Sequence, residues 1–522
     1  MSYRERRNNL INQINFYMRI HILPILMLAV GFQTISFAQD ISNKRYPYEP
    51  ASKASTDISK GELLQFSFKQ SKLYPGTIRS YWVYVPKEYK PENPACLFVC
   101  MDNVIFNAPT VFDYLISKKE MPVTIGVFIQ SGTIIKNDST VIRYNRTNEF
   151  DNMNDRFARF IEEEILPDVK KQKTVDGRSI NISHLSNDHA IAGASSGAIC
   201  AFTVAWHRPD LFSRVFSAIG TYVGMRGGDQ YPVLIRKTET KPIRVYLQDN
   251  KNDSWNPLFG DWFKSNVDME AALNFSGYEV TNMWQEGGHE TKQATAIFAD
   301  AMRWLWKGWP EPVRSGPSAN NMLTAILDTN EQWQQVIQPI TTKKLKPNNI
   351  AILPDGSQYI LKDGTIFYKK KERTVVVDKD SNLGYALAVS PDKRQLVVSG
   401  KQSHWLYDYI IQPEGILADK QLLYWLHNPG NDDTSEVRSM SFDTNGNLYV
   451  ATEIGVQICD QNGRVRAILS LTAGAVSSLW FDGEKLDNLF VSCGSKVYKR
   501  KLRVTGSLST QKAVIPPSQR GG

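Results

Sequence analysis

The apolar and polar positions of this chain follow one pattern before about residue 310 and another after it. From residue 61 to residue 310, short apolar runs alternate with longer stretches in which apolar residues recur at helical spacing. Strands that alternate with helices favour a mostly parallel sheet with helices on both faces. The predicted strands are 79–86, 96–101, 123–129, 189–193, 243–248 and 279–284, and the predicted helices are 155–171, a helix that begins after Ser195, 268–277 and 295–308.

Beyond residue 348 the helical spacing nearly vanishes and one phrase repeats. Each copy is an apolar strand, a turn with Asp, Asn or Gly, and a second apolar strand. The copies recur at roughly 35 to 55 residues, a period typical of propeller blades. Unrelated strands of a β-sandwich have no reason to share their turn chemistry, so the repeat favours a propeller over a sandwich. The copies are 348–361, 385–399, 437–451 and 476–492.

The first forty residues have the pattern of an export signal. Four arginines within the first nineteen residues precede the apolar run 22–32, and small residues at 36 and 38 suit cleavage after Ala38. An apolar run of about eleven residues is too short for a membrane helix, which needs about twenty. We expect an exported protein, periplasmic or secreted, with no membrane span after cleavage. Met18 is an alternative start, because Arg19 and the apolar run follow it directly.

Composition and charge exclude several classes of protein. A chain with 42% hydrophobic and 22% charged residues is of the ordinary globular kind. The formal net charge of +8 is modest, and no stretch gathers Lys and Arg with interleaved aromatics, so no nucleic-acid partner is predicted. The five cysteines form no CxxC motif and no cluster with histidines, which predicts small buried hydrophobes and no zinc site.

The segment Gly193–Ala194–Ser195–Ser196–Gly197 is the first candidate for chemistry. It fits G-x-S-x-G, follows a predicted strand and opens a predicted helix, which is the setting of the nucleophile elbow in α/β hydrolases. A serine hydroxyl is a poor nucleophile at neutral pH and needs a base, which in turn needs an orienting acid. We therefore expect a histidine and a carboxylate downstream of Ser195.

Two histidines follow Ser195 in the α/β half. His207 lies on the helix of the elbow itself, three turns from the serine, where it cannot reach the hydroxyl. His289 lies in a glycine-containing loop just after a predicted strand, at the carboxyl edge of the sheet where a base belongs. His289 is therefore the candidate base.

The acid and the oxyanion hole are less sharply specified. Asp249 directly follows a predicted strand, whereas Asp253 lies four residues further on and has the reach of an orienting carboxylate. We favour Asp253 and keep Asp249 as the alternative acid. The oxyanion hole would combine the backbone N–H of Ser196 with one from the loop after 96–101, near Asp102 or Asn103.

Three tryptophans, Trp255, Trp262 and Trp284, are candidates for stacking on a sugar or phenolic ring of a substrate. Tryptophans at such positions are more often part of the hydrophobic core, and this alternative remains open.

At this point the α/β half resembles a known family. Roughly residues 60–308 resemble the enterochelin-esterase-like serine hydrolases, the putative esterase family that also contains feruloyl and acetyl-xylan esterases. The resemblance implies that Ser195 is the nucleophile, Asp253 the acid and His289 the base. The segments that carry it are 112–129, 155–167, 191–212, 244–253 and 286–290.

The α/β half departs from that family at two places. Relatives usually have Asp-Gly in the oxyanion loop, where this chain has Asp102-Asn103. After the catalytic histidine they often have Asn-Gly-Lys-His, where this chain has residues Glu290–Gln293. The resemblance therefore implies the triad but an altered fit to the substrate.

The C-terminal half, about residues 348–504, resembles the SMP-30/gluconolactonase/LRE propellers, which hold a divalent metal with Glu, Asn and Asp ligands. Here Tyr385 stands at the Asn position and Arg438 at the Asp position, and the blade with the glutamate is missing. Only Asn348 keeps a matching polar position. Arginine cannot ligate a cation and a phenol replaces an amide oxygen poorly, so we expect a degenerate propeller with no metal, no cofactor and no lactonase activity.

These observations predict an α/β hydrolase domain followed by an all-β, incomplete or reduced β-propeller. A chain of 522 residues is long enough for both. The expected divisions are a signal peptide (1–38), a flexible N-terminal segment (39–56), the esterase domain (57–310), a linker (311–322), the propeller (323–507) and a C-terminal tail (508–522).

The function predicted from the sequence is that of an exported serine carboxylic-ester hydrolase that acts through an acyl-enzyme. The substrate would be a small-molecule or carbohydrate ester, of a sugar-linked or siderophore type. The propeller would be non-catalytic and free for contact with a protein or a glycan. Two alternatives are an inactive binding or scaffold protein and a metal-dependent sugar lactonase.

Overall fold

The structure is a computed structural model of the chain, and it describes residues 51, 53, 57–136, 140–337, 348–428 and 436–518. The predicted signal peptide lies outside the described residues, as does nearly all of the predicted flexible segment. Among the residues described, no helix is long and apolar enough to cross a membrane. The described residues belong to one compact unit that contains an α/β domain and an all-β domain.

The α/β domain is built on one eight-stranded sheet within the described part of the chain. The first two strands run antiparallel to their neighbours, and the other six are parallel to one another. In spatial order the strands are β1 (Glu62–Phe68), β2 (Arg79–Val85), β4 (Thr124–Ile129), β3 (Cys96–Met101), β7 (His189–Ala194), β8 (Arg214–Ala218), β9 (Arg244–Asn250) and β12 (Glu279–Gln285).

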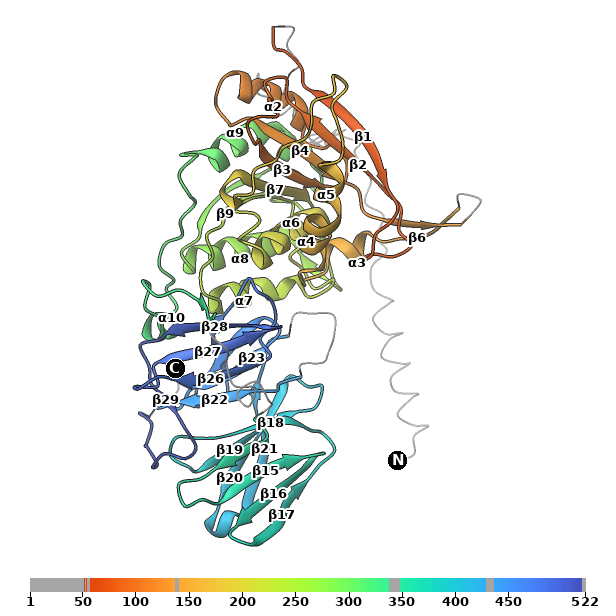
Figure 1. The fold of residues 1–522 in the computed structure, drawn as a ribbon. Helices are drawn as coiled ribbons and strands as arrows, with labels where there is room; N and C mark the ends of the chain where they lie inside the picture. Colours follow the sequence, from red (N-terminus) through yellow and green to blue (C-terminus); the bar gives the residue numbers. More distant parts are fainter. Residues whose placement is uncertain are drawn as a thin grey trace, which may run out of the picture. The chain divides into compact units, whose positions relative to one another are not determined.

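Helices cover both faces of this sheet, as the sequence predicts (Figure 1). Strands β3, β4 and β7 are buried over their whole length, which explains their uninterrupted apolar runs. One face packs against α2 (Ala108–Ser117) and α9 (Lys292–Trp306). The other packs against α4 (Arg156–Phe160), a π-helical turn (Ile161–Ile165), α5 (Leu166–Val169), α6 (Ser196–His207), α7 (Tyr231–Lys237) and α8 (Trp262–Phe275).

The remaining elements of this domain are short. A helix, α3 (Arg146–Phe150), follows the hairpin of β5 (Thr133–Ile135) and β6 (Val141–Tyr144). A second hairpin pairs β10 (Trp255–Asn256) with β11 (Gly260–Asp261). Two 3₁₀ turns, Ser186–Asp188 and Gly228–Gln230, complete the domain.

Several elements differ from the prediction, and three of the differences bear on the site or on the helices around it. Helix 268–277 in fact begins at Trp262, where the side chain of Asp261 accepts a hydrogen bond from the Lys264 N–H and caps the helix. Strand 243–248 continues to Asn250, so Asp249 lies inside the sheet rather than after it. The predicted helix 155–171 forms, with a π-helical turn in its middle.

The all-β domain consists of four sheets among the described residues, arranged like the blades of a propeller, which confirms the predicted reduced propeller. Helix α10 (Asn321–Ile326) precedes them. The first sheet contains β14 (Ile350–Ile352), β15 (Gln358–Lys362), β16 (Thr365–Lys370) and β17 (Arg373–Lys379), and the second contains β18 (Leu383–Val389), β19 (Gln395–Gly400), β20 (Trp405–Ile411) and β21 (Leu417–Trp425), with a 3₁₀ turn at Pro413–Gly415. The third sheet contains β22 (Met440–Asp443), β23 (Leu448–Thr452), β24 (Gly455–Cys459), β25 (Val465–Leu469) and β29 (Gly506–Ser507). The fourth contains β26 (Ser478–Asp482), β27 (Asn488–Cys493), β28 (Lys496–Lys501) and β13 (Gln334–Gln335).

The repeated phrase of the sequence is the first hairpin of each blade. In every copy an aspartate at the turn accepts a hydrogen bond from a backbone N–H one or two residues further on. This local turn chemistry explains why the phrase recurs. The first strands of successive blades lie beside one another, β14 next to β18, β18 next to β22 and β22 next to β26. The four aspartates are Asp355, Asp392, Asp443 and Asp482.

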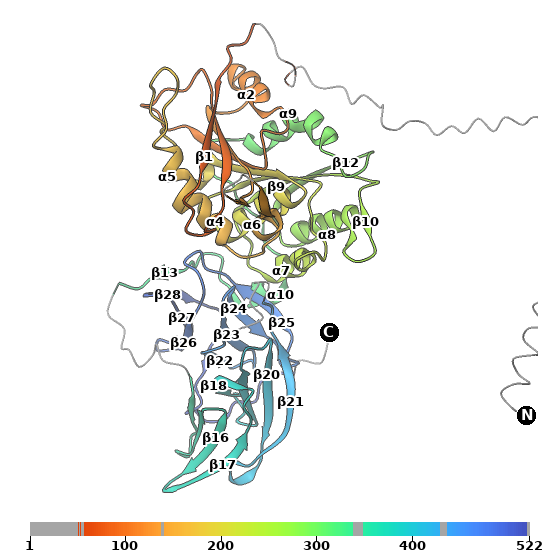
Figure 2. The same ribbon diagram turned by 90° about the vertical axis from the view of Figure 1, so that its right-hand side faces the viewer.

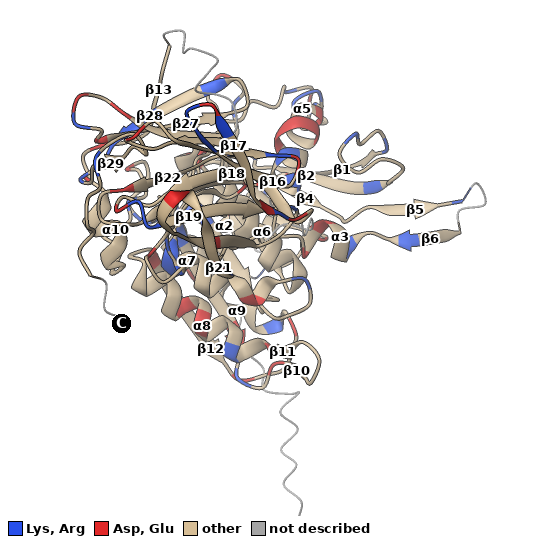
Figure 3. Cartoon of the chain, turned by 90° about the horizontal axis from the view of Figure 1, so that it is seen from below, with Lys and Arg blue, Asp and Glu red and all other residues tan. Residues whose placement is uncertain are grey.

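The two domains share buried apolar residues and also contact each other through charged and polar groups. Both guanidinium nitrogens Nη1 and Nη2 of Arg500, on β28, bind the carboxylate of Glu239 at 2.7 and 2.9 Å. The amide of Asn320 donates to the carbonyls of Arg236 and Arg466. Lys and Arg occur together with Asp and Glu on elements of both domains (Figure 3).

Candidate active site

Ser195 lies in a tight bend between β7 and α6. Its φ and ψ are 55° and −120°, a strained backbone conformation that lifts the side chain out of the sheet. The bend requires glycine at position 193, because a Cβ there would lie 2.1 Å from the carbonyl oxygen of Gly197. A Cβ on Gly197 would lie 3.0 Å from the Cβ of Met101. Steric crowding therefore explains why both flanking positions of the G-x-S-x-G motif are glycine.

Ser195, His289 and Asp253 form a continuous chain of contacts. Nε2 of His289 lies 2.8 Å from the hydroxyl of Ser195, and Nδ1 of His289 lies 2.6 Å from Oδ1 of Asp253. An ionised carboxylate only accepts, so Nδ1 carries the hydrogen and Nε2 presents its lone pair to the serine hydroxyl. The side chain of Asp253 is fully buried, whereas that of His289 is about 29% exposed.

The loop that bears His289 is held from the end of β9. The amide nitrogen of Asn250 donates to the carbonyl oxygens of Gly288 and Glu290, at 2.7 and 3.3 Å. Gln293 donates to the carbonyl of Glu286 and to the carboxylate of Glu290. Gln293 is one of the departures from the family pattern, and here it closes the loop from its other end.

A second chain of polar groups reaches Ser195 from the opposite side. The indole N–H of Trp262 donates to the hydroxyl of Thr221 at 3.2 Å, and this hydroxyl lies 3.2 Å from that of Ser195. The ring of Trp262 also meets the imidazole of His289 edge-on, with centroids 5.9 Å apart. Trp262 is only 8% exposed, so it supports the site from within rather than facing solvent.

The predicted oxyanion amides lie beside a strained loop. Asp102, with φ of 71°, directly follows β3 and receives two hydrogen bonds from the guanidinium of Arg146, both at 2.9 Å. Arg146 also donates to the carbonyl of Ala194, the residue before Ser195. The N–H groups of Ser196 and Asn103 donate to no other described residue, so they are available to a ligand.

Asp249, the alternative acid, is buried inside β9 and makes no contact with His289 among the described residues. Its Oδ1 accepts a hydrogen bond from the backbone N–H of Asn250 at 2.6 Å. Burial, followed by the hydrogen bond and the charge of Asp253, raises the pKa of Asp249 to about 9. Asp253 is thus the carboxylate that meets the imidazole, and Asp249 lies behind it inside the strand.

The other two tryptophans lie further from the triad contacts. Trp255 is 68% exposed on the β10–β11 hairpin. It pairs with Asp261, the residue before Trp262. Trp284 packs edge-on against Phe263 of α8. Their role in substrate binding stays a prediction.

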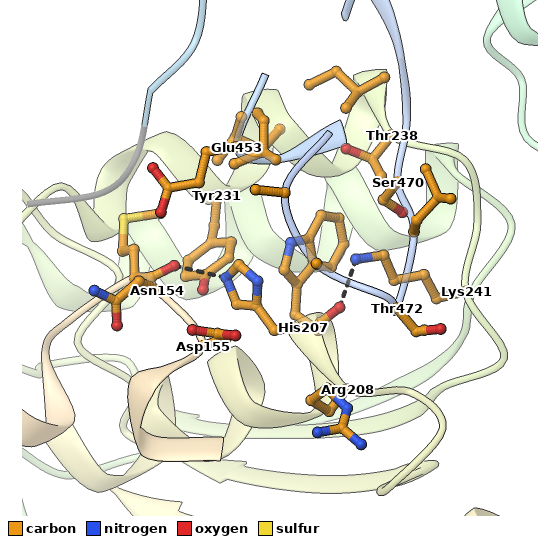
Figure 4. A pocket seen from close by; sticks show the side chains of 18 residues that line it. Asn154, Asp155, His207, Arg208, Tyr231, Thr238, Lys241, Glu453, Ser470 and Thr472 are labelled. Atoms are coloured by element: carbon orange, nitrogen blue, oxygen red, sulfur yellow. Dashed lines mark hydrogen bonds between the residues drawn. The ribbon is translucent and has the colours of Figure 1, made fainter. Parts of the chain in front are cut away.

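His207 faces a cavity away from the triad. Its Nε2 donates to the carbonyl of Met153, and burial together with Lys241 lowers the pKa of His207 to about 4. The cavity, of about 170 Å³, is lined by His207 and Lys241 from the α/β domain and by Ser470 and Thr472 from the β domain (Figure 4). Lys241 donates to the carbonyl of Trp206 near the end of α6, and burial lowers the pKa of Lys241 to about 7.

Tyr385, Arg438 and Asn348 stand at the positions where the resemblance to the lactonase propellers implies metal ligands. The guanidinium of Arg438 lies over the ring of Tyr385, 5.0 Å from its centroid. The amide of Asn348 accepts from the Ser439 hydroxyl and donates to the carbonyl of Met440. Among the described residues, no group of three or more His, Cys, Asp or Glu could hold a metal ion.

The eight-stranded sheet with a serine elbow at the end of β7 defines the class of the α/β domain, that of the α/β hydrolases. Residues 75–307 match the model of the family described as "Esterase: Putative esterase". A comparison with curated protein sequences finds no match.

Some solved structures are similar to the α/β half of this chain, and others are similar to the β half. A ferulic acid esterase is 14% identical, over 48% of this chain and 99% of that one, with a TM-score of 0.38. The enterobactin esterase FES from Shigella flexneri is 21% identical, over 50% and 63%, with a TM-score of 0.37. A "putative gluconolactonase" is 19% identical, over 31% and 60%, with a TM-score of 0.27. All three scores lie below 0.5, so the family assignment rests on the match to the family model.

Sequence reasoning singled out the three residues that the structure brings into contact, but it missed their supports. Asn250, Thr221 and Arg146 act on the site through contacts with residues far along the chain. Asn250 had one usable signal, because it follows Asp249 at the end of a predicted strand. Thr221 and Arg146 stand in no motif, and only the folded chain reveals them.

Proposed function

We propose that this protein is an exported serine carboxylic-ester hydrolase with the triad Ser195, His289 and Asp253. The observation that carries the proposal is the unbroken chain of short contacts from Asp253 through His289 to the hydroxyl of Ser195, at the carboxyl edge of a parallel sheet. The esterase family of residues 75–307 gives the general reaction, the cleavage of an ester.

The reaction would run in two halves through an acyl-enzyme. Oγ of Ser195 attacks the ester carbonyl carbon while its proton passes to Nε2 of His289. Collapse of the tetrahedral intermediate expels the alcohol, which takes that proton from His289. Water then attacks the acyl group, gives a proton to His289, and the acid leaves as Oγ of Ser195 regains the proton.

Each supporting group has a defined part in this scheme. The backbone N–H groups of Ser196 and Asn103 would bind the oxyanion, and both are free to donate. Asp253 fixes the tautomer of His289 and stabilises the imidazolium that forms. Thr221, itself bound by Trp262, orients the serine hydroxyl toward His289.

The substrate class proposed is a small-molecule or carbohydrate ester, of a sugar-linked or siderophore type. The partly exposed His289 and the exposed Trp255 on the β10–β11 hairpin support a site open to a ligand with a ring. The β domain is proposed to be non-catalytic and to contact a protein or a glycan. Arg438 and Tyr385 at the ligand positions of the related lactonases support this assignment.

The test is hydrolysis of p-nitrophenyl acetate and of a panel of acetylated and feruloylated sugar esters. Wild-type protein is expected to turn over at least one substrate, and Ser195→Ala is expected to lose at least about a thousandfold in kcat. Ser117→Ala, an exposed serine on α2 that bonds only its own helix, is the matched control. A fluorophosphonate probe should label wild type at Ser195 and leave the alanine variant unlabelled.

Three outcomes would contradict the proposal. Equal activity in wild type and Ser195→Ala would remove the serine mechanism. No turnover and no labelling would favour a binding or scaffold protein. Opening of gluconolactone that needs calcium or zinc would favour a lactonase. Export is tested separately, by sequencing the N-terminus of the mature protein, which is expected to begin at Gln39.

A further inference from the structure

Two aspartates lie together behind the imidazole of His289. Asp249 is inside β9 and fully buried, and the side chain of Asp253, four residues later, is fully buried as well. The two carboxyl groups lie within hydrogen-bonding reach of each other. Two ionised carboxylates this close in a buried site repel strongly, so one of them must hold a proton.

The hydrogen-bond partners show where a proton is missing. Oδ1 of Asp253 accepts from His289 and from the backbone N–H of Ser254, and Oδ1 of Asp249 accepts from the N–H of Asn250. Oδ2 of Asp253 and Oδ2 of Asp249 are buried and have no hydrogen-bond partner among the described residues. Each is an acceptor without a donor.

Asn266 of α8 adds a third acceptor to the same place. Both hydrogens of its amide are used, on the carbonyls of Gly220 and Trp262, at 2.8 and 3.0 Å. Its Oδ1 is buried without a hydrogen-bond partner among the described residues, and the side chain of Asn266 lies within hydrogen-bonding reach of Asp249. A buried cluster of acceptors with no donor is costly, and a single proton on Asp249 relieves it.

We propose that Asp249 is a positioning residue that keeps a proton at neutral pH and donates it to Oδ2 of Asp253. This inference rests on the proposed function, because its role is exerted through Asp253 on His289. It makes the two aspartates a unit with one negative charge, and it leaves Oδ1 of Asp253 to the imidazole.

The surroundings of Asp249 favour the protonated form. Burial is the largest cause of the raised pKa of Asp249, followed by its hydrogen bond with Asp253 and the charge of Asp253. No ion pair among the described residues includes Asp249, and its neighbours from β9 and α8, Asn250 and Asn266, are uncharged. The nearby Lys251 is exposed and binds Glu286 instead.

Two substitutions at position 249 test whether Asp249 acts as a hydrogen-bond donor or only fills space. Asp249→Asn keeps the shape and places an NH₂ group where the proposal has an O–H, so it can donate to Oδ2 of Asp253. Asp249→Leu keeps much of the volume and removes the donor. Each variant is compared with wild type in the full chain, by thermal unfolding and by kcat and KM for a p-nitrophenyl ester.

The kinetics are measured near neutral pH, at about 7.5, where the proposal has Asp249 protonated. Under these conditions Asp249→Asn is expected to keep kcat within about threefold of wild type. Asp249→Leu is expected to lose about tenfold to a hundredfold in kcat with little change in KM, the effect of removing a hydrogen bond from a buried carboxylate. Wild type should also lose activity as the pH rises through about 9, and Asp249→Asn should lack that alkaline limb.

A spectroscopic measurement on wild type makes the test independent of the variants. At about pH 8.5, Asp408 and Asp443, with pKa values raised by burial to about 7 and about 6, are mostly ionised. An infrared C=O band of a protonated carboxyl group should persist at that pH, disappear as the pH rises through about 9, and be absent from Asp249→Asn.

The outcomes distinguish this inference from the proposed function. Loss of activity in folded Asp249→Asn as large as in Asp249→Leu, or absence of the carboxyl band, would overturn the role of Asp249 while Ser195-dependent activity remained. An alkaline limb unchanged in Asp249→Asn would overturn it as well. Activity that survives Ser195→Ala would instead overturn the proposed function.

Discussion

At the scale of single residues, the arrangement of Ser195, His289 and Asp253 depends on side chains outside these three. Asn250 is the clearest example, because one amide group binds the carbonyl oxygens on both sides of His289. The imidazole is therefore placed by the backbone of its loop as much as by Asp253.

We expect Asn250→Ala to lower kcat by about tenfold to a hundredfold and to leave KM nearly unchanged, because the loop of His289 loses two hydrogen bonds to a buried donor. Steady-state kinetics on a p-nitrophenyl ester measures this. Lys251→Ala is the matched control, since Lys251 is the next residue after Asn250 and its side chain is half exposed. Equal kinetics for the two variants would show that the amide does not place the histidine.

The protonated Asp249 also predicts how stability varies with pH. Its folded pKa of about 9 lies above that of an unfolded aspartate, about 4, so between these values the folded state binds more protons than the unfolded state. Stability contributed by this group therefore falls as the pH rises from about 4 to about 9.

Asp249→Asn should remove that dependence. We expect the free energy of unfolding of the variant to fall less than that of wild type between about pH 7 and pH 9. Asp408 and Asp443, with pKa values of about 7 and about 6, are present in both proteins, so their titration cancels in the comparison. Denaturant unfolding at a series of pH values gives the comparison. Parallel curves for the two proteins would mean that Asp249 is ionised throughout.

At the scale of elements, the bend between β7 and α6 is the most constrained part of the α/β domain. Gly193 has no positive φ, so its need for glycine comes from the nearby backbone of Gly197 and Ala198. The bend is tight because the strand must end and the helix begin within one residue.

We expect Gly193→Ala to destabilise the protein by about 3 kcal/mol or more, because the new Cβ would overlap backbone that cannot move without opening the bend. Gly76→Ala is the control. Gly76 has φ of 78° but open space around its Cβ position, so only about 1 kcal/mol of backbone strain is expected. Thermal unfolding that ranks the two variants the other way would contradict the steric argument.

Much of the element order was predictable, because buried parallel strands give apolar runs and covering helices give helical spacing. Strand β8 was not predicted, since it begins with Arg214. That side chain is buried because its guanidinium lies over the ring of Trp306, 4.8 Å from the centroid. A contact over such a sequence distance leaves no local signal.

The site was predictable to the same extent. Ser195 and His289 stand in local patterns that need glycine or follow a strand, and these patterns are visible in the sequence. The choice between Asp249 and Asp253 was not decided by spacing, because it depends on where β9 ends. The strand continues to Asn250 and so buries Asp249 within the sheet.

At the scale of the whole molecule, the two domains meet through a buried cation. The side chain of Arg500 is 1% exposed, and Glu239 is its only carboxylate partner among the described residues. Removing one member of such a pair leaves an unpaired charge in a buried place.

We expect Glu239→Ala to destabilise the protein by about 3 kcal/mol, and Glu239→Ala combined with Arg500→Met to recover most of that loss. Differential scanning calorimetry gives both values. Glu120→Ala, which breaks a half-exposed pair with Arg303, should cost less than about 1 kcal/mol. A double variant no more stable than Glu239→Ala would show that Arg500 stabilises by packing and not by pairing.

The short strand β13 has a further consequence for how the chain is made. Gln334 and Gln335 precede all four blades in the sequence, yet β13 pairs with β28 in the last sheet (Figure 2). During synthesis β13 therefore has no strand to pair with until residues near 500, which form β28, leave the ribosome. The β domain cannot assemble blade by blade to completion, and a chain that stops before β28 would present an open strand edge to its neighbours.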